Sequence, residues 1–443
     1  MIEKNKENKN STIGSSLLPI LEEYGVDIIF GIPGVHTVEI YRGLHKTSIK
    51  HITPRHEQGA GFMADGYSRV SGKPAVCLVI TGPGLTNILT AMAQARADSI
   101  PMLIISSVNP YDNKRKLSGL LHELPNQQKL LKKIAISSLT VKKTKDLIPA
   151  IKKSFLKMLE ERPGPVHLEI PTNVLNYEYQ KLKKNNLCIK KKKIKSSEKK
   201  INDVSNYLTH AKYPILLLGG GARGCDEYIL KIVEKLSPYV ITTINARGIL
   251  GDHSMCIPAS PTLKTVRKEL KKADIVLAVG TEFGETDYDM YKDGNFPKLK
   301  KLIRVDINKN QLTKNIQPHL SIRSDAIYFF KKLSEILLVK KHYKKSSLQT
   351  PQTAKIIRKL CLKEIEPKFK VPLNLISTIS SNFPDAILVG DSTQPTYAGN
   401  LYTKTSKQGK WFNSATGYGT LGYAPPASIG AKLAKPKKPV ICI

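Results

Sequence analysis

The chain has 443 residues, 41% of them hydrophobic, and a formal net charge of +34. This length is too great for one ordinary core and predicts about three domains. The apolar runs are far shorter than the roughly 18 residues of a membrane span, so we expect no transmembrane helix and no membrane partner. Residues 1–11 are polar and lack the apolar stretch of a secretory signal, which favours a cytoplasmic protein.

Two Lys-rich segments, residues 181–200 and 339–347, carry much of the positive charge. Both are poor in aromatic residues, and neither has the signature of a nucleic-acid-binding fold. We interpret them as solvated linkers and expect no nucleic-acid partner, with a polyanion-binding surface as the alternative. The absence of any CxxC pair is typical of free thiols in a reducing compartment. The cysteines are Cys77, Cys188, Cys225, Cys256, Cys361 and Cys442.

Helix-like and strand-like segments alternate along the first part of the chain. Apolar residues at helical spacing predict helices, and short apolar runs between turns predict strands. The predicted helices are 13–24, 58–70 and 85–97, and the predicted strands are 27–30, 49–53, 75–80 and 102–106. This alternation indicates a parallel sheet that is covered on both faces. Ligands bind at the carboxyl ends of such strands, where the turn 31–34, Glu57 and the loop 81–84 fall.

Two further α/β blocks follow. Strands are predicted at 215–218, 240–243, 275–279 and 302–305 in the second block, and at 386–389 and 439–443 in the third. We therefore predict an α/β protein with three Rossmann-like, doubly wound parallel-sheet domains, the third of them incomplete. The predicted domains are 1–180, 201–338 and 354–443, with linkers at 181–200 and 339–353. An incomplete third sheet would leave the last apolar strand at its edge.

Glu57 follows the predicted strand 49–53, within the run RHEQ at 55–58. Taken alone, it is best interpreted as a helix cap or an ion-pair partner. The small-residue helix behind it and the glycine loops at neighbouring strand ends favour a partly buried position beside a concave site. A buried carboxyl group there is suited to exchange a proton with a ring nitrogen.

Six motifs occur in the order found in one enzyme superfamily. They are FGIPG at 30–34, RHEQGA at 55–60, MADGY at 63–67, GPG at 82–84 with Asn87, GPV at 164–166 with EIP at 169–171, and GYGTLG at 417–422. Together they resemble the acetolactate synthase and 2-oxo acid decarboxylase superfamily of thiamine diphosphate enzymes. The resemblance covers nearly the whole chain. No single motif is decisive, and the order of all six carries the resemblance.

The resemblance implies a role for each matching residue. Glu57 is similar to the glutamate that hydrogen-bonds the aminopyrimidine ring of thiamine diphosphate and thereby activates the thiazolium carbon. Diphosphate-side contacts are implied for Ser392, Thr393 and Gln394. Gly419 resembles the residue whose carbonyl accepts from the aminopyrimidine, and Leu421 resembles the apolar wedge that bends the cofactor. Pyrimidine-side contacts are implied for Pro33, Gly34, Gly82, Pro83, Gly84 and Asn87.

A metal and a subunit arrangement are implied as well. In this superfamily different subunits hold the two halves of the cofactor, so we expect a homodimer or homotetramer with active sites between subunits. Mg²⁺ is held there by a Gly-Asp-Gly turn and a later Asn-Asn pair together with the diphosphate. Neither element occurs between Pro439 and Ile443. We therefore predict no metal ligand in this sequence, expect the Mg²⁺ ligands beyond Ile443, and interpret the chain as a C-terminally truncated form that is inactive alone.

The middle block departs from the flavin-binding landmarks of biosynthetic acetolactate synthases. The corresponding segments read GILGDH at 248–253 and TEFGETDY at 281–288, and neither matches. We therefore predict that the protein binds no FAD. An acidic stretch in this region either attracts a guanidinium group or forms a solvated loop. It contains Glu282, Glu285, Asp287 and Asp289.

Several loops are most similar to the 5-guanidino-2-oxopentanoate decarboxylase branch. They are LHELP at 121–125, the stretch 280–288, and GDSTQPTYAGNLY at 390–402 with WFNS at 411–414. The resemblance implies non-oxidative decarboxylation of that small 2-oxo acid to 4-guanidinobutanal and carbon dioxide. His122, in the first loop, is a candidate proton donor or a polar surface residue. The alternatives are an acetolactate synthase that acts on pyruvate, and an inactive remnant that binds polyanions.

Overall fold

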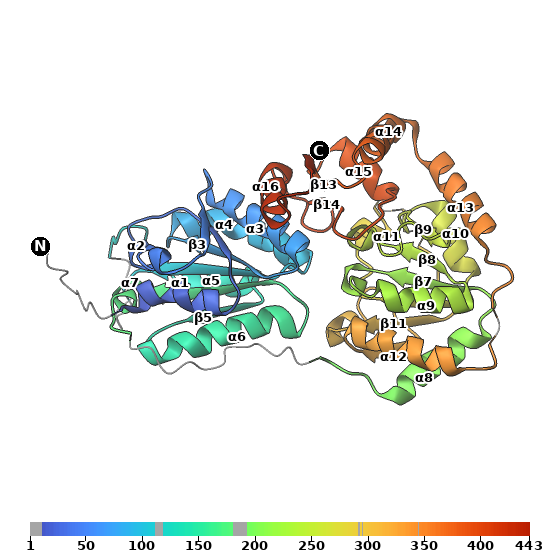
Figure 1. The fold of residues 1–443 in the computed structure, drawn as a ribbon, viewed down its shortest axis with the longest axis horizontal. Helices are drawn as coiled ribbons and strands as arrows, with labels where there is room; N and C mark the ends of the chain where they lie inside the picture. Colours follow the sequence, from blue (N-terminus) through green and yellow to red (C-terminus); the bar gives the residue numbers. More distant parts are fainter. Residues whose placement is uncertain (1–10, 111–117, 180–192, 291–292, 295, 344) are drawn as a thin grey trace, which may run out of the picture. The chain divides into compact units, whose positions relative to one another are not determined.

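The computed structural model describes residues 11–110, 118–179, 193–290, 293–294, 296–343 and 345–443 (Figure 1). The chain divides into two compact units. Unit 1 comprises Met1–Lys191 and Pro426–Lys435, and unit 2 comprises Lys192–Pro425 and Pro436–Ile443. Most of the predicted tail 1–11 and much of the predicted linker 181–200 lie outside the described residues. Within the described ranges no helix is both long and apolar enough to cross a membrane.

Unit 1 contains a six-stranded sheet in the order β2-β1-β3-β4-β6-β5, and every pairing in it is parallel. Its strands are β1 (Ile28–Gly31), β2 (Lys50–Ile52), β3 (Ala75–Val79), β4 (Met102–Val108), β5 (Ser137–Thr140) and β6 (Pro165–Pro171). The connecting helices are α1 (Ile13–Glu23), α2 (Val38–Tyr41), α3 (Glu57–Ser71), α4 (Pro83–Ala97), α5 (Gln127–Ile134), α6 (Leu147–Glu160) and α7 (Thr172–Leu175). The predicted parallel sheet is confirmed.

Helices cover both faces of this sheet. Val76 and Leu78 of β3 point to one face, where they share a buried cluster with Leu17 of α1 and Phe155 of α6. Cys77, between them, points to the other face, where its thiol lies 3.7 Å from the Ala60 carbonyl of α3. This alternation follows from the two-residue period of a strand, and it explains why β3 is buried along its whole length.

Unit 2 contains a second six-stranded parallel sheet, in the order β12-β11-β10-β7-β8-β9. Its strands are β7 (Pro214–Leu218), β8 (Tyr239–Thr242), β9 (Cys256–Ile257), β10 (Ile275–Val279), β11 (Leu302–Asp306) and β12 (Leu320–Arg323). The surrounding helices are α8 (Glu198–His210), α9 (Asp226–Leu236), α10 (Lys264–Lys272), α11 (Glu285–Tyr288), α12 (Ala326–Val339) and α13 (Pro351–Glu364). One continuous hydrophobic cluster joins these elements.

A third, smaller parallel sheet has the order β14-β13-β15. The elements of this part of the chain are α14 (Pro367–Asn382), β13 (Ile387–Gly390), α15 (Gln394–Leu401), β14 (Trp411–Asn413), α16 (Ala424–Ala434) and β15 (Val440–Cys442). Residues 426–434 of α16 belong to unit 1. The predicted strand 439–443 therefore exists as β15, and it lies at the sheet edge. The three sheets confirm the predicted three-domain α/β fold.

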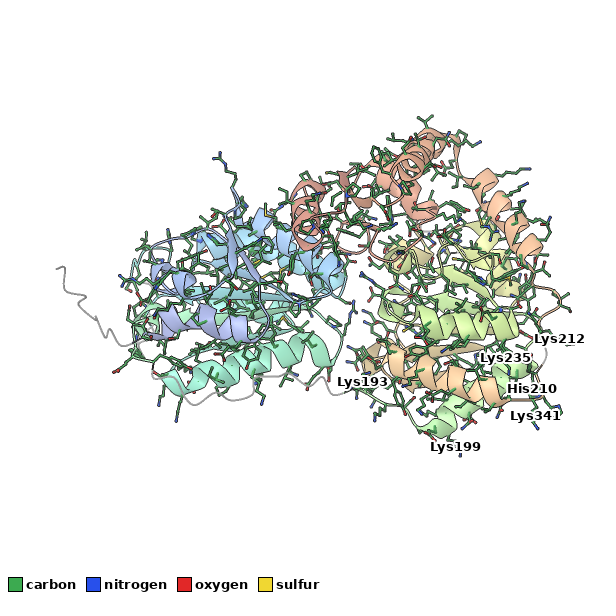
Figure 2. The ribbon with its side chains drawn as sticks, in the orientation of Figure 1. Lys193, Lys199, His210, Lys212, Lys235 and Lys341 are labelled. Carbon is green, nitrogen blue, oxygen red and sulfur yellow. The ribbon has the colours of Figure 1, made fainter. Side chains whose placement is uncertain are left out.

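Much of the described positive charge on unit 2 lies on its surface. Lys193, Lys199, Lys212 and Lys341 are exposed, and Figure 2 shows their side chains on this unit. Cys77, Cys225, Cys256 and Cys361 are buried free thiols, and Cys442 is exposed.

Candidate active site

Glu57 is the first residue of α3, and the residue is 9% exposed. Its Oε2 accepts a hydrogen bond of 3.0 Å from the Asn87 side-chain amide on α4. The other oxygen faces the backbone of Gly84, where an added Cβ would lie 3.3 Å from Oε1. The capping role considered for Glu57 belongs instead to His56, whose side chain accepts from the Gln58 backbone N–H. The Glu57 carboxylate is therefore free to face the glycine loop.

The loops around Glu57 meet at the carboxyl ends of β1 and β3, which are neighbours in the sheet. A Cβ on Gly34 would lie 2.6 Å from Ile80, and a Cβ on Gly84 would lie 2.8 Å from the same side chain. Glycine at both positions lets the two loops approach each other closely. Pro33 and Pro83, beside these glycines, are exposed. The structure thus brings the predicted pyrimidine-side residues together on one edge of unit 1.

Gly82 has a backbone conformation that favours glycine, with φ of 65°. A Cβ there would lie 2.5 Å from the carbonyl oxygen of His122. Pro83 follows as the first residue of α4, where its missing N–H costs no helical hydrogen bond. The loop that carries His122 therefore packs directly on the glycine loop 82–84. His122 is part of the candidate site.

A second histidine, His36, lies against His122. Their ring centroids are 5.3 Å apart, and the ring planes differ by 58°. Burial and the nearby His122 both lower the pKa of His36. His36 was not among the predicted site residues, although its position two residues after the predicted turn 31–34 was an available signal.

A buried polar network supports the His122 loop. Gln127 begins α5 and has no exposed surface. It accepts from the Thr81 hydroxyl at 2.8 Å, and its amide donates to the Ser107 carbonyl at 3.0 Å and to Glu169 at 2.9 Å. Gln127 thereby links the ends of β3, β4 and β6, five positions after His122 in the chain. This residue was also missed, because glutamine at the start of a helix carries no distinctive sequence signal.

A buried histidine lies deeper in the same unit. His167 on β6 has hydroxyl groups on both ring nitrogens, Ser106 at Nε2 and Ser138 at Nδ1, each at 2.8 Å. Burial lowers the pKa of His167 to about 3, so the ring is neutral near pH 7. It is a structural group of the sheet.

In unit 2, Ser392 and Thr393 lie in the turn between β13 and α15, and Gln394 is the first residue of α15, as their position at a strand end predicts. The Ser392 hydroxyl lies 3.1 Å from that of Ser414 and donates to the Thr420 carbonyl at 3.3 Å. Gln394 is exposed at the start of α15. The backbone N–H groups of Ser392 and Thr393 both donate to Asp391, so an anion at this strand end would have to replace these contacts and that of the Ser392 hydroxyl.

The glycine-rich segment 417–422 is held close to this turn. Gly419 has φ of 74° and donates its N–H to the Ser414 carbonyl at 3.1 Å. Leu421 is 70% exposed despite its apolar side chain. An exposed leucine on a fixed loop can provide an apolar contact for a ligand.

The acidic stretch of the middle block takes part in structural contacts. Asp287 accepts from the Ile244 backbone N–H at 3.0 Å, and Asp289 forms an ion pair of 3.3 Å with Arg267. These contacts favour the structural interpretation of Asp287 and Asp289. No cluster of His, Cys, Asp or Glu able to hold a metal ion occurs among the residues that the structure describes.

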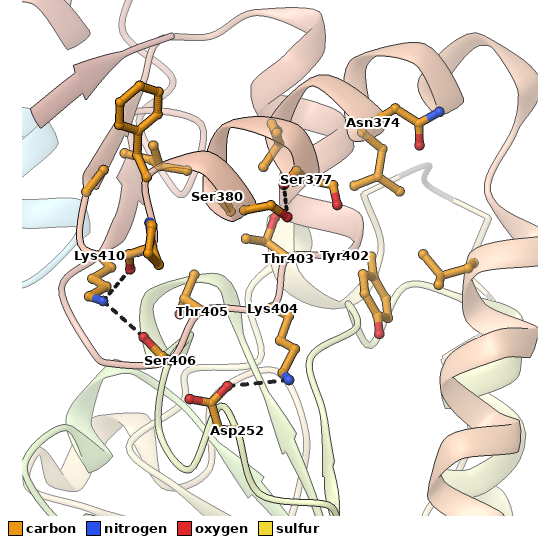
Figure 3. A pocket seen from close by; sticks show the side chains of 18 residues that line it. Asp252, Asn374, Ser377, Ser380, Tyr402, Thr403, Lys404, Thr405, Ser406 and Lys410 are labelled. Carbon is orange, nitrogen blue, oxygen red and sulfur yellow. Dashed lines mark hydrogen bonds and ion pairs between the residues drawn. The ribbon is translucent and has the colours of Figure 1, made fainter.

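Unit 2 also contains a pocket of about 450 Å³ (Figure 3). Hydroxyl groups of α14 and of the segment 402–406 line it together with two lysines. Lys404 lies 3.4 Å from Asp252, and Lys410 donates to the Pro384 carbonyl at 2.7 Å and to Ser406 at 3.0 Å. No predicted site residue lines this pocket, so it lies apart from the candidate site.

The fold and the site define a multidomain α/β protein with a buried carboxylate among glycine-rich strand ends. Family models of thiamine pyrophosphate enzymes match three parts of the chain. The N-terminal TPP binding domain matches residues 11–130, the central domain 201–333 and the C-terminal TPP binding domain 391–443. Thiamine pyrophosphate is another name for thiamine diphosphate.

Curated relatives agree with these matches. The probable 2-ketoarginine decarboxylase AruI of Pseudomonas aeruginosa is 37% identical over 438 residues, which cover 97% of this chain and 76% of that protein. The large subunit of acetolactate synthase isozyme 1 of Escherichia coli is 30% identical over 451 residues, covering 98% and 76%. An acetolactate synthase large subunit of Buchnera aphidicola is 32% identical over 444 residues, covering 96% and 75%. The chain belongs to the thiamine pyrophosphate enzyme family, as its motifs predict, and it is a thiamine diphosphate-dependent enzyme.

Proposed function

We propose that this enzyme removes carbon dioxide from a 2-oxo acid without oxidising it, and that the substrate is 5-guanidino-2-oxopentanoate. The products are 4-guanidinobutanal and carbon dioxide. The name of the Pseudomonas aeruginosa relative, a probable 2-ketoarginine decarboxylase, supports this choice of substrate. The buried, hydrogen-bonded carboxylate of Glu57 is the observation that carries the proposed chemistry.

The residues of unit 1 fit the aminopyrimidine side of thiamine diphosphate. A Cβ on Gly84 would come within 3.3 Å of Glu57 Oε1, so the absence of a side chain keeps this oxygen accessible. Glu57 offers the ring a hydrogen-bond acceptor, while Asn87 fixes the orientation of the carboxylate. When bound, thiamine diphosphate would supply a nucleophilic ring carbon that adds to the 2-oxo group, and a cationic thiazolium ring that takes up the electron pair released with carbon dioxide.

We propose that unit 2 binds the diphosphate end of a cofactor molecule whose other end is held by unit 1 of another subunit. The hydroxyl of Ser392 and the backbone groups of Thr393 and Gln394 would bind the diphosphate at the end of β13. Leu421 would hold the bent cofactor, and Gly419 would accept from the aminopyrimidine. We propose that Mg²⁺ accompanies the diphosphate and that FAD is not required. We also propose the predicted domain boundaries, a homodimer or homotetramer and a cytoplasmic location.

The first test uses a version that covers the full length of the relatives, of which this chain covers about three quarters. Decarboxylation of 5-guanidino-2-oxopentanoate with thiamine diphosphate and Mg²⁺ is measured as aldehyde and carbon dioxide. Glu57→Gln keeps the size of the side chain but loses the carboxylate, so turnover should be lost while the melting temperature stays close to that of the wild type. Glu198→Gln is the matched control, because Glu198 also begins a helix and is exposed. Full turnover by Glu57→Gln would refute the role of Glu57.

The acetolactate synthase relatives support a second candidate function. Such an enzyme joins two molecules of pyruvate to give acetolactate and carbon dioxide. Incubation with pyruvate, with and without FAD, distinguishes the two functions by the product. Acetolactate formation without turnover of the guanidino acid would favour the second.

A further inference from the structure

His36 and His122 form a pair of imidazoles within unit 1. The two residues come from different loops, His36 from the turn after β1 and His122 from the segment before α5. Their ring centroids lie 5.3 Å apart. Each ring has an Nδ1 atom that is buried and has no hydrogen-bond partner among the described residues. A buried polar atom without a partner costs stability, and such atoms concentrate where a ligand or a proton transfer uses them.

Backbone packing places this pair beside the glycine loop. The carbonyl oxygen of His122 occupies the space where Gly82 would otherwise carry a Cβ. Two residues further on, Gly84 faces the carboxylate of Glu57. His122 also has φ of 56°, a left-handed conformation that is uncommon for a residue with a side chain. The cost of that conformation is consistent with a functional demand on the position of this loop.

The electrostatic surroundings favour a single charge on the pair. Two imidazolium ions at this separation repel each other, and burial further disfavours charge on His36. The carboxylates of the neighbouring elements have other partners. Glu123 accepts from backbone N–H groups of residues 118–120, Glu39 accepts from Thr12, and Glu57 accepts from Asn87.

We propose that His36 and His122 act as one acid–base pair that holds a single proton, with His122 as the donor to the substrate and His36 as its positioning residue. This proposal rests on the proposed decarboxylation. There, the bond between the carbonyl carbon and the carboxylate breaks, carbon dioxide leaves, and the electron pair remains with the carbonyl carbon. The proton from the pair forms the new C–H bond of the aldehyde, and water returns a proton to the pair.

Proton coupling can be measured without substrate or cofactor. The imidazole Cε1–H signals of the wild-type protein are titrated by NMR and assigned with His36→Asn, His122→Asn and the control His45→Asn, which removes an exposed histidine of the same unit. In His122→Asn the His36 signal should titrate at a pH higher by about one unit, because the repulsion is gone. His45→Asn should leave it unchanged. An unchanged His36 titration in His122→Asn would overturn the pair.

Turnover provides the second measurement, after melting curves confirm that the variants fold. His122→Asn should lower kcat by about 100-fold with little change in KM, because only the proton transfer is lost. His36→Gln should lower kcat less and shift its pH profile, and the double variant should be no slower than His122→Asn alone. A His36→Gln enzyme with the wild-type pH profile would refute its positioning role. If the wild-type enzyme releases no carbon dioxide, the proposed function fails, whereas the NMR titration still decides whether the pair is coupled.

Discussion

Gly61 and Gly59 lie two residues apart on α3 and provide a matched test of how this helix is positioned. A Cβ on Gly61 would lie 2.4 Å from the Ala91 Cβ and 3.0 Å from Ile88 Cγ1 on α4. A Cβ on Gly59 would meet only Pro54, at 3.8 Å, which is ordinary contact. We expect Gly61→Ala to destabilise the protein and Gly59→Ala to stabilise it.

The magnitudes follow from these distances. Carbon atoms of different residues pack best at about 3.5 to 4 Å, so α3 and α4 must separate by roughly 1 Å in Gly61→Ala. Overpacking of this kind costs up to about 3 kcal/mol, whereas replacing a helical glycine with alanine gains up to about 1 kcal/mol. Gly61→Ala should therefore lose about 2 kcal/mol and Gly59→Ala should gain up to about 1 kcal/mol.

Thermal melting, with the transition of unit 1 followed separately, measures this difference. About 3 kcal/mol corresponds to roughly 6 to 12 °C for a unit of this size. The separation of α3 from α4 should also lengthen the 3.0 Å contact between Glu57 and Asn87, so Gly61→Ala should bind thiamine diphosphate more weakly. Equal melting temperatures of the two variants would refute the close packing of these helices.

Three other variants test the site and its support. His167, with its pKa lowered to about 3, is protonated only in the unfolded chain between pH 6.5 and pH 5, so it should lower the free energy of unfolding by about 2 kcal/mol over that range. In denaturation at several pH values, His167→Gln should reduce the fall by this amount and leave the smaller contributions of His36 and His253, whose pKa values burial also lowers. Gln127→Leu should cost about 3 kcal/mol because it leaves the buried Thr81 hydroxyl and Oε2 of Glu169 without the amide partner, although Oε1 of Glu169 still accepts from Thr140. Gln128→Leu, at a partly buried position, should cost much less. Leu421→Ala should weaken thiamine diphosphate binding in calorimetry without lowering the melting temperature of the cofactor-free protein, because this leucine is 70% exposed.

The sequence predicts the strand ends of unit 1 well, because the relevant signals are local. The turn 31–34 and the loop 81–84 each follow a short apolar run, and parallel strands bring such ends to one edge. The pairing of β1 with β3 confirms that these ends are neighbours. The position of Glu57 was predictable for the same reason, because the residue lies between a predicted strand and a predicted helix of small residues.

Two edge strands, β5 and β12, escaped prediction for a physical reason. β5 has the sequence SSLT and β12 has LSIR, and neither is an apolar run. Each of these strands pairs with one neighbour only, β5 with β6 and β12 with β11. The other side of each strand has no partner strand in the described part of the chain, so its side chains need not be apolar. These segments are strands because their backbones hydrogen-bond to β6 and β11. Their own residues therefore do not predict them.

The contact between His36 and His122 could not be predicted from either segment. It depends on the left-handed backbone of His122 and on the anchoring of its loop through Gln127, neither of which leaves a periodic pattern. The prediction for His122 therefore named the residue without its partner.

The contacts of Glu57 explain why we propose a chemical role for this glutamate and not for another glutamate at the start of a helix. A glutamate at the start of a helix normally stabilises the helix dipole, and Glu198 does so while exposed to solvent. At α3, His56 already provides the cap, so the helix does not require the Glu57 carboxylate for that purpose. Asn87 instead orients the carboxylate from another helix, toward a glycine that leaves space in front of it. Burial of a carboxylate costs free energy, and a bound ring nitrogen would offset that cost, which is why we place the chemistry at Glu57.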